Sequence, residues 1–391
     1  MKKKIAVLTA TRSEFGLLKP LILNLMKEAA FDTEVLVTGM HLSADFGNTY
    51  REIEEAGIPI KKKIECLTKG DTPADISQTM ARALIGFGDY FADNKPDLLI
   101  VLGDRYETLA VCIAAMNAEI PIAHLCGGES TEGAIDEAIR HSITKMSNIH
   151  FVSTELYRKR VIQLGEQPDR VFNVGSLCVE NVINTNFLTK AELEKELNFT
   201  LTNKYGIVTF HPVTLEKNSG IEQFNELLYA LEDFSDMSFI FTKANADAGG
   251  RTINKMIDEY AASHTNIVAV ASLGVRKYLS AVKESAVVIG NSSSGIIEVP
   301  CLHVPTVNIG NRQKGRIIPE SIVNSLPTKS DIIEKIKLAI SESFKEKIDS
   351  FDNPFGNGHT SEMIVKILKD YMQSNDLLDI RKAFYDVEVS S

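Results

Sequence analysis

Short apolar runs, rich in β-branched residues and leucine, alternate with longer stretches of helical periodicity along almost all of the 391 residues. This alternation is typical of parallel sheets that carry helices on both faces. Strands are expected at 5–9, 34–38, 98–102, 121–125, 149–153 and 171–174, and again at 206–210, 238–242, 266–270, 286–290 and 306–309. Each half therefore has enough strands for a sheet of its own, which predicts an α/β fold of two Rossmann-like, doubly wound domains.

The chain length suits two domains of about 100–200 residues each. We place the first domain at 1–177 and the second at 178–365, because residues 184–203 are polar and helical and lack a core pattern. Beyond Ser330 no further strand is expected, and helical stretches at 331–347 and 359–372 follow. Residues 366–391 are expected to form C-terminal helices that pack back on the first domain.

Charge and composition exclude several classes of protein. With 42 Lys and Arg against 52 Asp and Glu, the net charge is −10, so the chain repels nucleic acid and anionic membranes. No apolar run approaches the roughly 18 residues of a membrane span. The five cysteines are scattered without a C-x-x-C pair, which favours a reducing cytoplasm over a disulfide scaffold. An anionic ligand would need a local basic pocket.

Ligands of open α/β sheets bind beyond the carboxyl ends of the strands, so the residues at those ends are the candidates. The strand ends of the first half carry Arg12, His41, Asp104, Arg105 and Glu129. Those of the second half carry His211, Asn245, Asp247 and the run Gly290–Gly295. No G-x-G-x-x-G follows the first strand and no P-loop motif occurs, which disfavours a dinucleotide dehydrogenase or a P-loop NTPase.

The run Gly290–Gly295 lies between a strand and a helical segment and would offer backbone N–H groups and hydroxyls to a phosphate. A plain Ser/Asn helix cap is the alternative interpretation. Arg312, which follows the next strand with Gln313, Lys314 and Arg316, would add the positive charge that a diphosphate requires. Arg12 would grip a phosphate too, or else form a surface ion pair with Glu14.

Acid–base candidates are Asp104, Asp136 and His211. Asp104 follows an apolar strand, where its pKa can be tuned, and Asp136 shares a helix face with Arg140 at i,i+4 spacing. His211 precedes a proline at a strand end, where an imidazole can act as acid or base. A turn Asp, a helical ion pair and a structural histidine are the alternatives. The histidines show no metal-ligand spacing, so no catalytic metal is expected.

Taken together, the strand-end motifs resemble the hydrolysing UDP-N-acetylglucosamine 2-epimerases, over essentially the whole chain. The matching stretches are Thr11–Gly16, Thr38–His41, Gly103–Arg105, Gly127–Glu129, Ile135–Lys145, His211–Thr214, Asn291–Gly295 with Glu298, and Arg312–Arg316. The resemblance implies a glycosyltransferase-B-like architecture with the active site in the interdomain cleft. It also implies a cytoplasmic homodimer or homotetramer in sialic acid biosynthesis.

By position, the resemblance implies roles for individual residues. Nucleotide contacts would come from Arg12, Ser292, Ser293, Glu298 and Arg312, and the sugar would be surrounded by Asp104, Glu129, Asp136, Arg140 and His211. The family reaction removes the C2 proton, expels UDP to leave a glycal, and adds water with inversion at C2. N-acetylmannosamine and UDP would be the products, and the reaction would require no cofactor and no metal.

Two positions depart from the family pattern: Cys126 stands where many members have glutamate, and Leu17 where some have lysine. Glu129 either supplies the missing carboxylate or none is needed. The same chemistry on a UDP-linked 2,4-diacetamido-trideoxyhexose, a step toward legionaminic-type sugars, is the nearest alternative. A glycosyltransferase-B enzyme and a non-catalytic UDP-sugar sensor are the others.

Overall fold

The computed structural model describes residues 2–70, 72–130, 135–211, 219–244, 250–271, 273–373 and 380–388. The chain forms two compact units, one of residues 1–181 together with 355–391 and the other of residues 182–354. The second unit therefore ends before the 365 expected from the sequence, and the last helix belongs to the first unit. The two units are described separately below.

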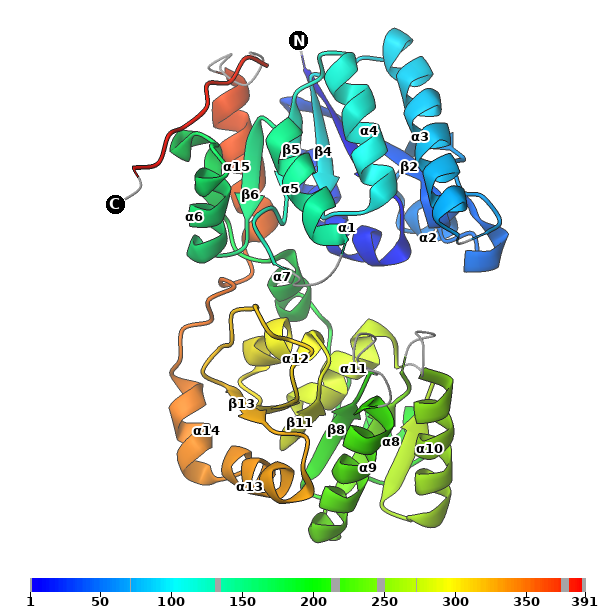
Figure 1. Ribbon diagram of the computed structural model, residues 1–391, viewed down its shortest axis with the longest axis vertical. Helices are drawn as coiled ribbons and strands as arrows, with labels where there is room; N and C mark the ends of the chain where they lie inside the picture. The colour runs from blue at the N-terminus through cyan, green and yellow to red at the C-terminus, as the bar shows by residue number, and fades with distance from the viewer. Residues whose placement is uncertain are drawn as a thin grey trace. The chain divides into compact units, whose positions relative to one another are not determined.

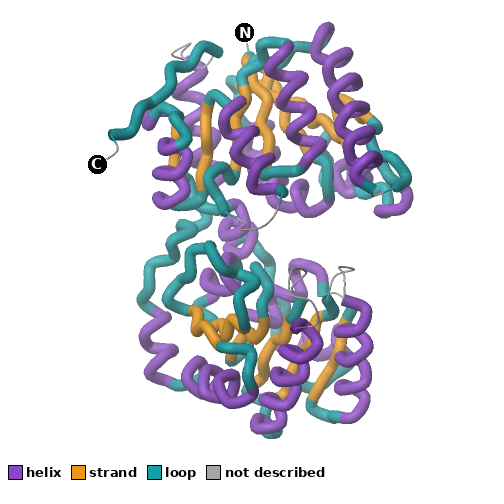
Figure 2. The backbone as a smooth tube through the Cα atoms, in the orientation of Figure 1, coloured by secondary structure: helices purple, strands orange, loops and turns teal. Residues whose placement is uncertain are grey.

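The first unit contains a seven-stranded, all-parallel sheet in the order β3-β2-β1-β4-β5-β6-β7 (Figures 1 and 2). Its strands are β1 (Lys3–Thr9), β2 (Phe31–Thr38), β3 (Ile60–Ile64), β4 (Leu98–Leu102), β5 (Ile122–Leu125), β6 (Ile149–Val152) and β7 (Val171–Asn173). β1 and β4 are neighbours, with Ile5 opposite Leu98, although two strands and three helices separate them in sequence. The strand order therefore reverses between β1 and β4.

Helices cover both faces of this sheet. They are α1 (Arg12–Lys27), α2 (Tyr50–Glu55), α3 (Pro73–Asp93), α4 (Tyr106–Asn117), α5 (Asp136–Met146), α6 (Glu155–Gln163), α7 (Leu177–Ile183) and α15 (Thr360–Gln373). Alternate residues of β1 point to opposite faces: Ile5 and Val7 pack with α1 and α15, and Ala6 and Leu8 pack with α3 and α4. Strands buried on both faces explain the continuous apolar runs in the sequence.

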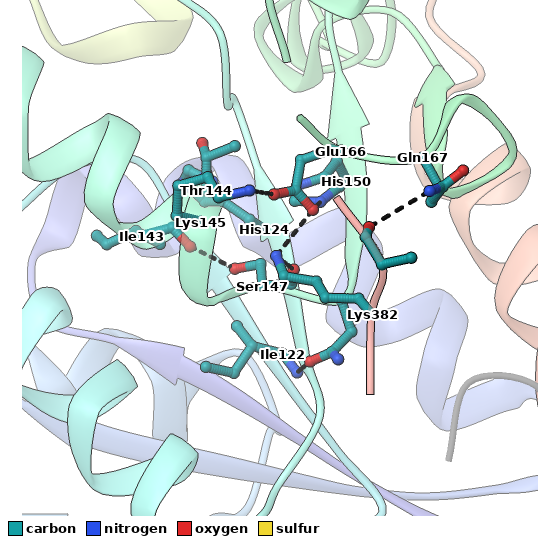
Figure 3. Close-up of polar contacts among 12 residues, drawn as sticks. Ile122, His124, Ile143, Thr144, Lys145, Ser147, His150, Glu166, Gln167 and Lys382 are labelled. Carbon is teal, nitrogen blue, oxygen red and sulfur yellow. Dashed lines mark hydrogen bonds and ion pairs between the residues drawn. The ribbon is translucent and has the colours of Figure 1, made fainter. Parts of the chain in front are cut away.

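The C-terminal segment 380–388 is extended and docks on the first unit (Figure 3). The Tyr385 N–H donates to the Gly165 carbonyl at 2.9 Å, and the Lys382 ammonium donates to Glu166 at 2.8 Å. The Phe384 ring packs against Gly165, and the Lys145 ammonium lies over the ring, 4.9 Å from its centroid. These contacts fix the segment beside β6 and α6.

The second unit repeats the topology with six parallel strands in the order β10-β9-β8-β11-β12-β13. The strands are β8 (Tyr205–Thr209), β9 (Ser238–Thr242), β10 (Ile267–Val270), β11 (Val287–Gly290), β12 (Thr306–Ile309) and β13 (Ile322–Ser325). Its helices are α8 (Lys190–Leu197), α9 (Ser219–Leu231), α10 (Gly250–Ser263), α11 (Gly274–Lys283), α12 (Ser294–Ile297), α13 (Lys329–Ala339) and α14 (Glu342–Asp349). The order reverses between β8 and β11.

The predicted fold class, two doubly wound α/β domains, is confirmed. Two strands were missed, and both lie at sheet edges: β3 carries three exposed lysines, and β13 has only four residues. The helix expected over 331–347 is two helices, because Ser341 caps α14 by accepting the Phe344 N–H at 3.3 Å. Across the described residues, none of the helices is both long and apolar enough to cross a membrane.

Candidate active site

Each unit has one place where ligands are expected, the crevice at the carboxyl ends of the two strands between which the order reverses. In the first unit these are the ends of β1 and β4, followed by Thr11–Glu14 and by Gly103–Glu107. In the second unit they are the ends of β8 and β11, followed by His211 and by Asn291–Ser294. The candidate residues that the structure describes lie at or beside these two places.

An ion pair between Asp104 and Arg140 joins the end of β4 to helix α5. Arg140 is almost fully buried, and its other terminal nitrogen donates to the Glu129 carbonyl at 2.8 Å and to Glu137 at 2.9 Å. Since every contact fixes the plane of the guanidinium, Arg140 holds the Asp104 carboxylate in one orientation. Asp104 keeps about a quarter of its side chain exposed, 27%, which leaves room for a substrate.

Asp136, the first residue of α5, stands one turn from Arg140. Partial desolvation and the neighbouring charge of Asp104 raise the pKa of Asp136, while Arg140 and Arg105 act in the opposite direction. The charge of Asp104 therefore disfavours the ionised form of Asp136. Such a carboxyl pair can hold and release a proton.

His124 on β5 forms a hydrogen bond with the turn that follows β4. Gly103 has a φ of +74°, which allows the chain to turn at once after the strand. The fully buried His124 contacts the Gly103 carbonyl through Nε2 at 2.8 Å and Thr144 through Nδ1 at 3.2 Å. Burial lowers the pKa of His124 to about 3, so the ring is neutral and donates from Nε2.

Cys126 and Glu129 occupy the turn that follows β5. Cys126 adopts a φ of +65°, uncommon for a residue with a side chain, and burial first, then the charge of Glu129, raises the pKa of its thiol. The thiol is therefore protonated at neutral pH. Glu129 accepts a hydrogen bond from Ser153 at 3.4 Å, so its carboxylate is directed toward β6.

Three further candidates of the first unit make contacts within the protein. Arg12 is exposed and pairs with Glu52 at 2.9 Å, not with Glu14. His41 is fully buried, with Nε2 3.0 Å from the Thr9 hydroxyl and Nδ1 2.8 Å from the Thr49 hydroxyl, and burial lowers its pKa to about 4. Arg105 donates from Nε to Glu107 at 2.6 Å.

In the second unit, the Asn291 side chain bridges the ends of β8 and β11. Its Oδ1 accepts the His211 N–H and its Nδ2 donates to the His211 carbonyl, both at 2.8 Å. The Asn291 carbonyl accepts from Arg312 at 2.9 Å and from Gln313 at 2.8 Å. This fully bonded asparagine fixes the backbone of His211 and brings Arg312 to the same edge of the sheet.

A cavity of about 400 Å³ opens at this edge. It is lined by Thr209, His211, Thr242, Lys243, Ala244, Ala271, Leu273, Gly274, Val275, Tyr278, Ser292, Ser294 and Glu298. Desolvation raises the pKa of Glu298, although Ser294 partly offsets it. Ser292 and Glu298 thus line one cavity, while Ser293 is half-buried at the start of α12. The wall combines small apolar side chains with hydroxyl, imidazole, ammonium and carboxyl groups, which suits a ligand that has both apolar and polar parts.

Gly290 is required where the cavity begins. Its φ is +134°, and a Cβ at this position would lie 1.9 Å from the Thr209 carbonyl oxygen. Only glycine therefore lets β11 pass so close to β8 before the Asn291–Ser294 turn. Asn245 and Asp247, which were also expected to bind the ligand, lie outside the described residues.

Reasoning from the sequence did not name Glu107, and it gave His124 and Gln313 no role of their own. His124 lies within β5 and Glu107 in the first turn of α4, but their contacts with Gly103 and Arg105 depend on the fold. In the described part of the chain, no group of three or more His, Cys, Asp or Glu side chains is placed to hold a metal ion.

Fold and site define an α/β protein of two Rossmann-like domains, with a cavity of about 400 Å³ in one and a carboxylate–arginine cluster in the other. The model of the UDP-N-acetylglucosamine 2-epimerase family matches residues 23–369. The chain belongs to this family, as its strand-end motifs indicated.

Curated relatives extend over most of the chain. A Campylobacter jejuni protein named GDP/UDP-N,N'-diacetylbacillosamine 2-epimerase (hydrolyzing) is 43% identical over 88% of this chain and 89% of its own length. The Escherichia coli polysialic acid biosynthesis protein P7 is 40% identical over 98% of both. The solved Neisseria meningitidis UDP-GlcNAc 2-epimerase bound to UDP-GlcNAc has a TM-score of 0.76 at 20% identity, over 94% of this chain and 100% of its own, and shares the fold.

Proposed function

We propose that the protein is a hydrolysing 2-epimerase of a UDP-linked 2-acetamido sugar, with UDP-N-acetylglucosamine as substrate and N-acetylmannosamine and UDP as products. The observation that carries the proposal is the Asp104–Arg140 pair beside Asp136. Asp104 is a carboxylate held in one orientation, Asp136 is a carboxyl group whose pKa is raised above its ordinary value, and Arg140 is a buried cation. Family membership supports the same chemistry.

The reaction needs two proton transfers at C2 because the configuration there is inverted. One group takes the weakly acidic C2 proton while the C1–oxygen bond breaks and UDP leaves with the bonding electrons, which gives a glycal. Water then adds to C1, and a proton is delivered to C2 from the other face. Asp104, Asp136 and His211 are the groups we assign to these transfers, and Glu129 is a further carboxylate near the sugar.

Arg140 orients Asp104, and most of the proposed nucleotide contacts come from the second unit. Ser292, Ser293, Arg312 and Arg12 are assigned to the diphosphate, because hydroxyls and guanidinium groups stabilise the charge that develops on the leaving group. Glu298 is assigned to the ribose hydroxyls from its place in the cavity wall. His41 and Arg105, with Asn245 and Asp247, remain predicted ligand contacts.

Proton NMR in heavy water, without added acceptor, tests the proposal. Wild-type enzyme with UDP-N-acetylglucosamine should give UDP and N-acetylmannosamine with deuterium at C2. Asp104→Asn should lower kcat by at least about a hundredfold, in the range for general acid–base groups. Asp97→Asn is the matched control, since Asp97 stands at the opposite end of the same strand and accepts the Lys4 N–H at 2.8 Å. Intact substrate with wild-type enzyme would refute the proposal for this sugar.

A second candidate substrate is UDP-N,N'-diacetylbacillosamine, a 2,4-diacetamido-trideoxyhexose. It is favoured by the name of the Campylobacter jejuni relative, which is 43% identical. The same assay with this sugar distinguishes the two candidates, because the nucleotide sugar with the larger kcat/KM is the better substrate. UDP release only after an acceptor is added would indicate a transferase, and nucleotide binding without turnover a sensor.

A cytoplasmic location, a homodimeric or homotetrameric state and a role in sialic acid biosynthesis remain predictions. Sedimentation equilibrium of the purified chain measures the oligomeric state directly. Deletion of the gene followed by analysis of surface sugars would test the biosynthetic role.

A further inference from the structure

Helix α5 is connected to the turn that carries Asp104 in two places, one turn of helix apart. At the first, the Arg140 guanidinium pairs with the Asp104 carboxylate. At the second, the Thr144 hydroxyl lies 3.2 Å from His124 Nδ1, and His124 Nε2 lies 2.8 Å from the Gly103 carbonyl oxygen. Thr144 is therefore linked through the imidazole ring to the residue that precedes Asp104.

The link between Thr144 and Gly103 runs through the interior of the first unit. His124 and Thr144 have no exposed surface, and the two side chains lie next to each other (Figure 3). A Cβ on Gly127, in the turn after β5, would lie 3.1 Å from His124 Nδ1 and 3.1 Å from Thr144 Oγ1. The backbone of Gly127 therefore packs against both side chains, which leaves the ring little room to turn.

The direction of each hydrogen bond follows from the chemistry of the partners. The Gly103 carbonyl can only accept, so the neutral ring carries its proton on His124 Nε2. His124 Nδ1 is then an acceptor, and the Thr144 hydroxyl is the donor within reach. Thr144 Oγ1 also lies 3.0 Å from the Arg140 carbonyl oxygen, but a carbonyl inside a helix is already bonded to a backbone N–H. The single hydroxyl proton therefore belongs to His124.

We propose that His124 and Thr144 are positioning residues for Asp104. Thr144 donates to His124 and His124 donates to the Gly103 carbonyl, so helix α5 holds the backbone of the turn as well as the carboxylate. A general base must lie within hydrogen-bond reach of the proton that it takes, so a looser turn lowers the rate of the chemical step. This inference rests on the proposed function, in which Asp104 takes part in proton transfer.

The expected kinetic result is a loss of kcat without a change in KM. Both side chains are buried and reach Asp104 only through Gly103, and most of the proposed nucleotide contacts come from the second unit. Thr144→Val keeps the shape of the side chain and removes the donor. It should lower kcat about tenfold, since a small displacement of a reacting group is costly, and leave KM unchanged. Thr144→Ser keeps the hydroxyl and should retain the wild-type kcat.

Ser147→Ala is the matched control. Ser147 ends the same helix, is fully buried, and donates its hydroxyl to the Ile143 carbonyl at 2.8 Å (Figure 3). The substitution removes a buried hydroxyl from α5 without breaking the link to Gly103, so kcat should equal that of the wild type. All variants are compared below the temperature at which circular dichroism shows the first of them to unfold.

The hydrogen bonds themselves are tested in the free enzyme by ¹⁵N NMR of protein labelled at histidine. The His124 signals, identified by their loss in His124→Gln, should show a proton on Nε2 and none on Nδ1. In Thr144→Val the Nδ1 signal should shift because its donor is lost, and in Ser147→Ala it should stay in place. A wild-type ring with its proton on Nδ1 overturns the inference, as does an Nδ1 signal that Thr144→Val leaves unshifted.

The outcomes separate this inference from the proposed function. Equal losses of kcat in Thr144→Val and Ser147→Ala, or a higher KM at unchanged kcat in Thr144→Val, overturn the inference while the epimerase activity stands. If Thr144→Val does not fold, Thr144→Ala removes the same donor and takes its place in both measurements. No turnover by wild-type enzyme on either sugar overturns the proposed function, and the NMR measurement then decides by itself whether Thr144 donates to His124.

Discussion

Glu166 is predicted to stabilise the first unit through a buried cluster of charges, and Glu166→Gln tests this. Its carboxylate is 1% exposed and lies 2.6 Å from the Lys145 ammonium, 2.8 Å from that of Lys382 and 3.1 Å from His150 Nε2 (Figure 3). Burial alone would raise the Glu166 pKa, but the hydrogen bonds and charges of these partners outweigh it and lower the pKa to about 2.

The magnitude follows from that pKa. A carboxyl group held at about 2 against an ordinary 4.5 contributes about 3 kcal/mol to folding stability. Because the folded-state pKa is lowered, this contribution is fully present above pH 4.5 and is lost as the pH falls toward 2. Glu166→Gln also leaves the Lys382 ammonium without its carboxylate, and breaking a buried pair costs about 3–5 kcal/mol.

Hydrogen exchange measures the effect where it acts, since the chain has no Trp to report on unfolding. At pH 7 the Tyr385 amide, bonded to Gly165 at 2.9 Å, should exchange about a hundredfold faster in Glu166→Gln. Glu155→Gln is the control: Glu155 is an exposed glutamate of α6, paired with Arg158 at 3.4 Å, and its loss should change stability by less than about 0.5 kcal/mol. Equal effects of the two substitutions, or an unaltered loss of stability between pH 4.5 and 2 in Glu166→Gln, would refute the reasoning.

Three further predictions concern single residues. The raised pKa of Glu14 should stabilise the fold fully below pH 4.5 and be lost by about pH 7, so that wild type loses about 3 kcal/mol relative to Glu14→Gln over this range in urea unfolding. Gly290→Ala should destabilise the second unit by at least about 3 kcal/mol in thermal unfolding, because its Cβ would meet the Thr209 carbonyl at 1.9 Å. Glu298→Gln should weaken UDP binding about tenfold in titration calorimetry, through loss of a charge-assisted hydrogen bond; unchanged affinity would remove Glu298 from the nucleotide site.

The central strands were predictable because parallel strands covered on both faces are written as continuous apolar runs, as in Leu98–Leu102. The strand Ile60–Ile64 was not predictable in this way. It lies at the edge of the sheet and pairs with one strand only, and its three exposed lysines interrupt the apolar pattern. The end of one helix and the start of the next at Ser341 were missed, because the sequence does not show whether a serine lies inside a helix or caps it. In the structure the Ser341 hydroxyl accepts the Phe344 N–H and so begins α14.

The candidate residues could be named from the sequence because they follow strands, but the partners of these residues could not be predicted. The sequence places Asp136 and Arg140 on one helix at i,i+4 spacing, yet Arg140 pairs with Asp104, 36 residues away, and with Glu137. That choice depends on where α5 lies relative to the end of β4. The support of Gly103 by His124 has the same origin, because only pairing of β4 with β5 brings them together.

The two units use the same strand order but connect the ends of their central strands differently, and this difference bears on function. In the second unit a neutral amide, that of Asn291, bridges β8 and β11 through two hydrogen bonds to His211. In the first, the charged side chains Glu14, Arg105 and Glu107 gather after β1 and β4. An amide bridge holds its geometry at any pH, whereas the interactions of carboxyl groups change with each proton gained or lost. If the proposed function holds, we expect the proton transfers to depend mainly on the first unit. The pH dependence of kcat in a His211→Asn variant would then show whether the His211 imidazole takes part as well.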